Sequence, residues 1–210
     1  KDKCVNLNMN TEKQQTFAGK QAIEKAAEAT YLGNVLNYKA DPHAEITQKM
    51  QEKNRTLWKL TDYWKAMQAS QKWKILIFDA VRKSKLLYGL ETTQLPKSCR
   101  KRLDAFQVKG LRKILGFKHT YWDRSATNIH ILETATEIAY KKGSPKYLAR
   151  NAGREIELFS ITFKKRRKKL MGHVVRTDDN DPLRQVTLQP GTAKPVLWGT
   201  RRAGKPRQQW

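Results

Sequence analysis

Cysteine, acidic side chains and long hydrophobic runs are all scarce in this chain of 210 residues. Its two cysteines, Cys4 and Cys99, are too few for a disulfide framework, and no histidine lies at a zinc-ligand spacing from them. We therefore expect no metal, no cofactor and a reduced, intracellular protein. The longest apolar run is Ile75–Phe78, far short of the roughly 18 residues that a membrane-spanning helix needs, so we expect no membrane insertion.

The charge of the chain is strongly one-sided. Lysine and arginine number 43 against 19 aspartate and glutamate residues, which gives a formal net charge of +24. Such an excess repels itself in a compact state unless a polyanion neutralises it. Nucleic acid is therefore the expected partner, and an anionic membrane surface is the weaker alternative.

Two amphipathic patterns, joined by a short break, run from Ser70 to Phe117. The first predicts a helix that begins at Ser70, ends at Gly89 and buries a face formed by Trp73, Leu76, Ile77, Ala80, Ser84, Leu87 and Tyr88. The second predicts a helix that begins near Pro96 and Ser98, ends at Gly116 and buries Leu103, Phe106, Gly110, Leu111 and Ile114. The opposite face of this second helix is cationic and carries Lys101, Arg102, Lys109, Arg112 and Lys113.

Short strands are predicted before these helices, and further helices on both sides. Apolar residues around Cys4–Met9, Thr16–Ala18 and Tyr31–Leu36 predict strands, whereas residues 21–29 fit either a helical turn or a loop. A long helix begins at Asp41-Pro42, and two more are expected at about 128–141 and 154–171. The expected fold class is α+β, mainly α: a small antiparallel sheet, an antiparallel helical bundle and an extended basic C-terminal arm.

Four cationic stretches are candidate nucleic-acid contacts: the cationic face just described, the loop that follows it, a later basic run together with Arg176, and the C-terminal arm. The loop after Gly116 places Tyr121 and Trp122 beside Lys118 and Arg124, and these two rings are the best candidates for stacking on bases; Phe106 and Tyr88 are expected in the core. An uninterrupted run follows at Lys164, Lys165, Arg166, Arg167, Lys168 and Lys169. We interpret it as a phosphate-binding helix, the alternatives being a solvated face or a nuclear-import signal.

The C-terminal arm, from Thr177 onward, is punctuated by proline and glycine, which rules out long regular elements. It carries the basic residues Arg201, Arg202, Lys205 and Arg207, which we expect to follow a phosphate backbone. Neighbouring protein subunits of a large assembly are further expected partners. His173 is expected to be a buried, hydrogen-bonded histidine at the end of the fifth helix.

Three stretches, in the same order, resemble the reverse transcriptases of non-LTR (LINE-type) retrotransposons. They are Ala29-Thr30-Tyr31-Leu32-Gly33, the run from Phe78 to Phe117, and a tail in which Gly172-His173-Val174-Val175-Arg176 precedes Arg201–Trp210. The resemblance spans the region from the primer-grip strand through the thumb and its downstream connector. It implies palm-like strands in 1–38, a thumb-like bundle in 39–118, connector helices with the basic cluster in 119–176, and the arm in 177–210.

The resemblance also implies a role in gripping nucleic acid without catalysis. The family holds its metal ions with palm aspartates upstream of the primer grip, and only Asp2 precedes Tyr31. Asp178-Asp179 stands in the wrong order and context, so we expect no two-metal site and no enzymatic activity from this chain alone. The leading hypothesis is a non-catalytic RNA-binding protein derived from such an enzyme and built into a ribonucleoprotein, for example a mitochondrial ribosome. The alternative is a fragment of an active reverse transcriptase, located in the nucleus, whose thumb and connector hold the template–primer.

Overall fold

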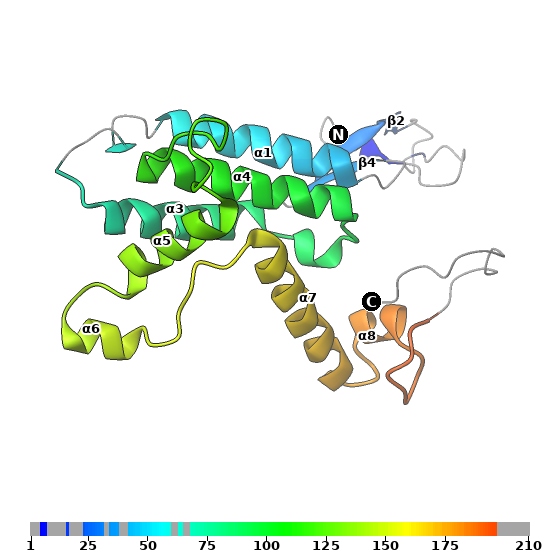
Figure 1. Cartoon of the computed structure of the whole chain (residues 1–210). Helices are drawn as coiled ribbons and strands as arrows, with labels where there is room; N and C mark the ends of the chain where they lie inside the picture. Colours follow the sequence, from blue (N-terminus) through cyan, green and yellow to red (C-terminus); the bar gives the residue numbers. More distant parts are fainter. Residues whose placement is uncertain are drawn as a thin grey trace. The chain divides into compact units, whose positions relative to one another are not determined.

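The computed structural model describes residues 5–7, 16, 23–31, 34–37, 42–59, 63–64 and 68–196. The chain divides into two compact units, Lys1–Lys164 and Lys165–Trp210. Helices dominate both units, and two small sheets lie near the N-terminus (Figure 1). The fold class is therefore α+β, mainly α, as the sequence predicts.

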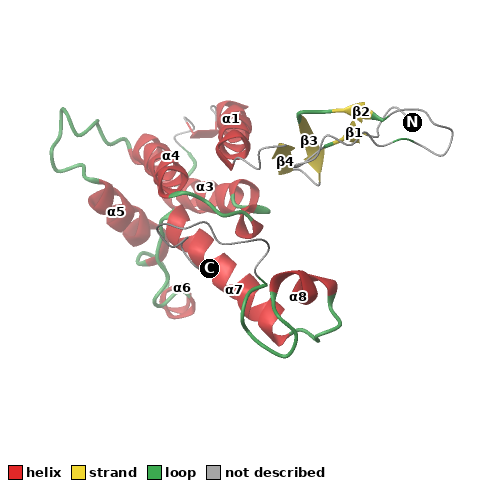
Figure 2. Ribbon diagram, turned by 90° about the vertical axis from the view of Figure 1, so that its right-hand side faces the viewer, coloured by secondary structure: helices red, strands yellow, loops and turns green. Residues whose placement is uncertain are grey.

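Four helices of the first unit pack into a bundle: α1 (Pro42–Lys59), α3 (Gln71–Leu86), α4 (Lys97–Leu115) and α5 (Asn128–Tyr140). Three of their boundaries follow local chemistry. The Ser70 hydroxyl accepts from the Trp73 amide at 3.4 Å and caps α3, while the Thr127 hydroxyl accepts from the His130 amide at 3.2 Å and caps α5. Gly116 ends α4 with a φ of 76°, which favours glycine. Helices α3 and α4 contact each other, and both contact α1 and α5, so the α3–α4 pair joins the bundle together (Figure 2).

Two apolar clusters fill the bundle, and α3 and α4 contribute to both. One cluster joins Leu86 and Leu87 to Leu103 and Phe106, together with Ile46 of α1. The other joins Ile75 and Phe78 to Val108 and Leu111, together with Ile131, Ala135 and Ala139 of α5. The start of α3 thus packs on the second half of α4, and the end of α3 packs on the first half of α4. The two helices are therefore antiparallel. Each leucine, isoleucine, valine or phenylalanine side chain contributes about 1.5–3 kcal/mol to the stability of the fold when fully buried.

The predicted buried face of α4 is largely confirmed, whereas that of α3 is mostly wrong: of its members, Leu87 is fully buried. Leu103, Phe106 and Leu111 are buried as predicted. In α3, however, Trp73 is 61% exposed and Tyr88, just after the helix, is 56% exposed. The buried face instead carries Lys74, Ile75, Phe78, Asp79, Arg82 and Leu86. Its three charged members interrupt the apolar pattern, so the more uniformly apolar neighbouring face was the better match to helical spacing.

The described strands form two short pairs. β1 (Val5–Asn6) pairs parallel with β2 (Glu24–Lys25), and β3 (Glu28–Tyr31) pairs antiparallel with β4 (Asn34–Asn37). The strand predicted at 31–36 is therefore divided between β3 and β4, and the segment 21–29 contributes strand, not a helical turn or loop. Cys4, Met9 and 17–18, part of the other predicted strands, lie outside the described residues.

A buried lysine ties the β3–β4 hairpin to the helices. The Lys49 ammonium of α1 donates to Asn34 Oδ1 at 2.7 Å and to the Tyr88 carbonyl at 2.5 Å, and it pairs with Glu45 at 3.0 Å. The backbone at Gly89 also lies close to Asn34: a Cβ at Gly89 would lie 2.4 Å from the side-chain nitrogen Nδ2 of Asn34. The hairpin, α1 and the end of α3 are thus fixed to one another within the first unit.

Three more helices follow the bundle: α6 (Pro145–Arg150), α7 (Phe159–Arg176) and α8 (Pro182–Thr187). Helix α5 agrees with the prediction, but α6 was not predicted. Helix α7 begins at Phe159 instead of Arg154, because α4 caps it from a distance: Gln107 Oε1 accepts from the Phe159 amide and Asp104 Oδ1 from the Ser160 amide, both at 2.8 Å. It continues to Arg176 instead of ending at Met171.

The segment after Thr177 is more regular than predicted. Asp181 caps α8, and a β-bridge between Leu188 and Pro195 closes the turn that follows. Leu188 and Val174 are the buried apolar residues of the second unit within its described part. An extended conformation was thus wrong for 182–187, while residues 197–210 lie outside the described residues.

Two helix glycines allow a matched test of the packing. A Cβ at Gly110 would lie 2.2 Å from the Phe78 ring, whereas one at Gly172 would meet only the mobile end of Arg176 at 3.3 Å. Gly110→Ala should lower the free energy of unfolding by about 1–3 kcal/mol, because the clash outweighs the gain in helix propensity. Gly172→Ala should raise it by about 0.5–1 kcal/mol. Urea denaturation measures both, and equal effects would contradict the assigned α3–α4 contact.

Candidate nucleic-acid interface

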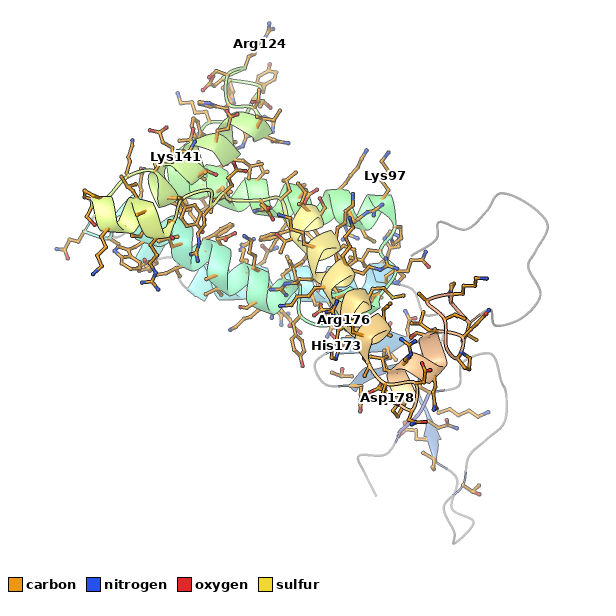
Figure 3. The ribbon with its side chains drawn as sticks, turned by 90° about the horizontal axis from the view of Figure 1, so that it is seen from below. Lys97, Arg124, Lys141, His173, Arg176 and Asp178 are labelled. Carbon is orange, nitrogen blue, oxygen red and sulfur yellow. The ribbon has the colours of Figure 1, made fainter. Side chains whose placement is uncertain are left out.

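The exposed side of α4 carries four lysines at helical spacing. Lys97, Lys101, Lys109 and Lys113 are all exposed, with exposed Ala105 at the vacant fourth-residue position between them. We call these four residues the lysine row. Residues four apart are neighbours on a helix, but each such step turns by about 40°, so the row winds about 160° around the exposed part of α4. At a rise of 1.5 Å per residue it is about 24 Å long. Lys97 projects outward from the beginning of the helix (Figure 3). Lys101, Lys109 and Lys113 were predicted, and Lys97 was missed.

Arg102 and Arg112, predicted on the same cationic face, instead bond within the protein. The Arg102 guanidinium donates to Thr47 Oγ1 of α1 at 3.0 Å. The Arg112 guanidinium donates to the carbonyls of Lys118 at 3.0 Å and Ala126 at 3.1 Å. Both side chains are half-buried. They still add positive charge, but they are less exposed than the lysine row, so the lysine row is the better candidate for phosphate binding.

The loop between α4 and α5 presents exposed aromatic and basic side chains. Tyr121 is 80% exposed and Trp122 77% exposed, and their rings meet edge-to-face with centroids 5.1 Å apart. Lys118 and Arg124 are exposed beside them, and Arg124 extends from the tip of the loop (Figure 3). The structure thus places all four predicted residues on one short surface loop.

One acidic residue also lies in this loop. The hydroxyl and amide of Ser125 donate to the Asp123 carboxylate at 2.6 and 3.0 Å, and these bonds hold the pKa of Asp123 below its ordinary value. Asp123 is therefore anionic at neutral pH and offsets one of the nearby positive charges.

The basic run of α7 crosses the boundary between the two units. Lys164 belongs to the first unit and is exposed; in the second unit Lys165, Lys168 and Lys169 are exposed, while Arg166 and Arg167 are half-buried. Six consecutive residues spread around the helix, so the run cannot present all its charges on one side. Arg176, at the end of α7, is exposed.

His173 is exposed, which contradicts the prediction of a buried histidine. Arg184 stabilises the end of α7 instead: its guanidinium donates to the carbonyls of Val174 and Val175 and pairs with Asp179. His173, Arg176 and Asp178 are labelled in Figure 3.

Asp178 and Asp179 form part of an exposed turn, as predicted. Among the described residues, no group of three or more His, Cys, Asp or Glu side chains is placed to hold a metal ion. None of the helices that the structure describes is both long and apolar enough to cross a lipid bilayer. The predicted arm contacts Arg201, Arg202, Lys205 and Arg207 lie outside the described residues.

A second exposed cationic patch was missed by sequence reasoning. It lies between the end of α5 and the start of the extended segment before α7, and consists of Lys141, Lys142, Lys146, Arg150 and Arg154. A hollow of about 240 Å³ lies in this region, with Lys141 and Arg154 in its lining. The signal was present in the sequence, since no acidic residue interrupts residues 141–154.

A buried arginine shows that positive charge in the sequence does not always reach the surface. Arg82 is 3% exposed, and its guanidinium lies 4.4 Å from the Phe78 ring centroid and 3.9 Å from that of Phe106. None of its three nitrogen atoms has a hydrogen-bond partner among the described residues. Burial lowers the pKa of Arg82 to about 9, so the side chain is still a cation at neutral pH. Arg82 therefore belongs to the core and not to the interface.

The chain was compared with family models, characterised proteins and solved structures, and none of them matches it. The resemblance to non-LTR reverse transcriptases thus rests on the motifs of the sequence.

Replacing Arg82 tests its assignment to the core. Arg82→Met keeps much of the side-chain volume and removes an unpaired buried charge, so the free energy of unfolding should stay the same or rise by up to about 2 kcal/mol, even though the cation–π contacts are lost. RNA affinity should not change. Urea denaturation and a filter-binding assay measure the two quantities, with Lys109→Ala as a control that should leave stability within about 0.5 kcal/mol. A marked loss of RNA affinity in folded Arg82→Met would place Arg82 in the interface.

Proposed function

We propose that this chain is a non-catalytic RNA-binding protein that holds the phosphate backbone, in the manner of the reverse-transcriptase thumb that its motifs resemble. The lysine row carries this proposal. Four exposed ammonium groups, spread over the solvent-facing part of one helix, suit contacts to several phosphates of a nucleic acid. Such contacts position a nucleic acid without reading its sequence.

The packing of α4 supports this reading. The other side of the helix is committed to two apolar clusters, so α4 is held rigidly and the lysine row keeps its spacing when no ligand is bound. Binding then costs side-chain entropy of the lysines but little reorganisation of the backbone. The second patch, around Lys141 and Arg154, and the exposed lysines of α7 add to the attraction of a polyanion.

Two settings fit such a protein. The chain acts either as a structural component of a ribonucleoprotein, such as an organellar ribosome, or as the thumb and connector of a retrotransposon polymerase. The three stretches of family pattern favour the second setting, since a copy without selection on template–primer binding is free to lose them. Competition between a folded RNA and an RNA–DNA hybrid separates the settings: preference for the hybrid favours the polymerase, and preference for the folded RNA favours the ribonucleoprotein.

Removing charge from the lysine row should weaken RNA binding in a salt-dependent way. For Lys101→Ala/Lys109→Ala, the slope of log affinity against log salt should become shallower by about one unit per lost contact, equally for unrelated RNA sequences. Titrations between about 50 and 200 mM salt measure the slope. Lys85→Ala/Lys194→Ala removes the same charge from exposed positions elsewhere and serves as the control. If both double variants flatten the slope equally, only the net charge matters and the lysine row is not the site.

The chain alone should not polymerise nucleotides. Its sequence offers no pair of carboxylates in the position of the family's metal-binding palm aspartates, and Asp179 pairs with Arg184 in a turn. Primer extension with Mg²⁺ or Mn²⁺ on RNA and DNA templates should give no product. Template-dependent incorporation by the purified chain would overturn the non-catalytic assignment.

A further inference from the structure

The loop that joins α4 to α5, residues 116–127, is anchored at both ends. At the first end, the Phe117 amide donates to the Arg112 carbonyl at 3.1 Å, and the Phe117 ring packs against the second apolar cluster and edge-to-face on His130. At the other end, Ala126 is fully buried and Thr127 caps α5. An exposed loop with two fixed ends is held in one conformation more tightly than its surface position suggests.

Arg112 connects the two limbs of this loop. Its guanidinium donates to the carbonyl of Lys118 on the outgoing limb and to that of Ala126 on the returning limb, at 3.0 and 3.1 Å. Within the tip, the Trp122 amide donates to the His119 carbonyl at 2.8 Å and the Ala126 amide to the Asp123 carbonyl at 3.2 Å. The backbone beneath the two aromatic residues is therefore fixed by the protein itself.

The loop holds two large rings in water. With Tyr121 80% and Trp122 77% exposed, neither contributes to the core, and leaving apolar surface in water is unfavourable by about 25 cal/mol per Å². Their edge-to-face contact at 88° keeps each ring in a defined orientation. Lys118 and Arg124 flank them with positive charge. Flat, oriented rings beside cations are the chemistry that stacks nucleobases and binds the adjoining phosphates.

We propose that Tyr121 and Trp122 form a stacking site for unpaired nucleobases, and that Arg112 is the positioning residue that holds this site in shape. The ligand is then RNA with a single-stranded segment next to a duplex, not a continuous duplex. In an A-form duplex each base face is covered by its neighbours, so a protein ring can stack only on a base that is terminal or splayed out. This inference rests on the proposed function, in which the lysine row holds the phosphate backbone.

The experiment compares two RNA hairpins with the same stem, one blunt and one with a single-stranded overhang that carries 2-aminopurine at its first unpaired position. Stacking on a protein ring quenches this fluorescent base, so the full chain should quench it and should bind the overhang hairpin more tightly. Trp122→Ala should abolish the quenching and lower affinity for the overhang hairpin by about 5- to 150-fold, the range for loss of one base–aromatic stack. Affinity for the blunt hairpin, which offers the rings only its end pair and its loop bases, should fall by less, so the preference for the overhang should shrink. Trp122→Phe should retain the quenching.

Arg112→Gln separates positioning from phosphate contact. If Arg112 is a positioning residue, its loss should reduce the quenching and the affinity for the overhang hairpin. The slope of log affinity against log salt should stay unchanged for both hairpins. A phosphate contact, when lost, flattens that slope by about one unit. The second result would overturn the role assigned to Arg112. Because Trp122 lies on the surface, the Trp122 variants test the stacking site even if Arg112→Gln unfolds.

The remaining outcomes also decide the question. If Trp122→Ala binds the overhang hairpin as the unaltered chain does, the stacking site is wrong. It is equally wrong if the aromatic pair is needed only for binding vesicles of phosphatidylcholine and phosphatidylserine, since the pair would then contact a membrane surface. If the unaltered chain binds neither hairpin, the proposed function fails, and that result differs from a loss that is larger for the overhang hairpin than for the blunt one.

Discussion

The contact between the Phe78 ring and Gly110 is the constraint on which the bundle depends. Glycine leaves room for the ring directly against the backbone of α4, and this close approach sets the separation of α3 and α4. It also places Arg82 between the rings of Phe78 and Phe106. Because both helices serve both apolar clusters, one side of α4 is fully occupied by the core. The backbone of α4 is thereby held in place, so the positions from which the lysine row extends are fixed as well.

The sequence predicts an element well where the chemistry of the element is local. Helix α4 has a clean apolar stripe and a terminal glycine, and α5 has its own threonine cap, so both agree with prediction. The start of α7 is not local: its amides bond to Gln107 and Asp104, which lie about fifty residues earlier in the chain. Helix α6 could have been found, because Ser144-Pro145 is a serine cap followed by proline in the first turn.

The candidate site, too, could be predicted only as far as its chemistry is local in the sequence. By position on the helix, Arg112 and Lys109 look alike, because both belong to the side of α4 that faces away from its apolar stripe. They differ only because the following loop turns back and brings the carbonyls of Lys118 and Ala126 to Arg112. Arg82 is the opposite case, a charged residue whose helical position coincides with the buried face. Local charge counts therefore predict a partner class but not the individual contacts.

Lys49 couples the unfolding of the β3–β4 hairpin to that of the helices. Its ammonium replaces its water shell with Asn34, Glu45 and the Tyr88 carbonyl, so separating the hairpin from α1 would take Asn34 away from a buried charge. Opening β3–β4 is thus coupled to the opening of α1 and the end of α3. In hydrogen-exchange terms, a short hairpin that would fray by itself acquires the protection of the bundle to which it is attached.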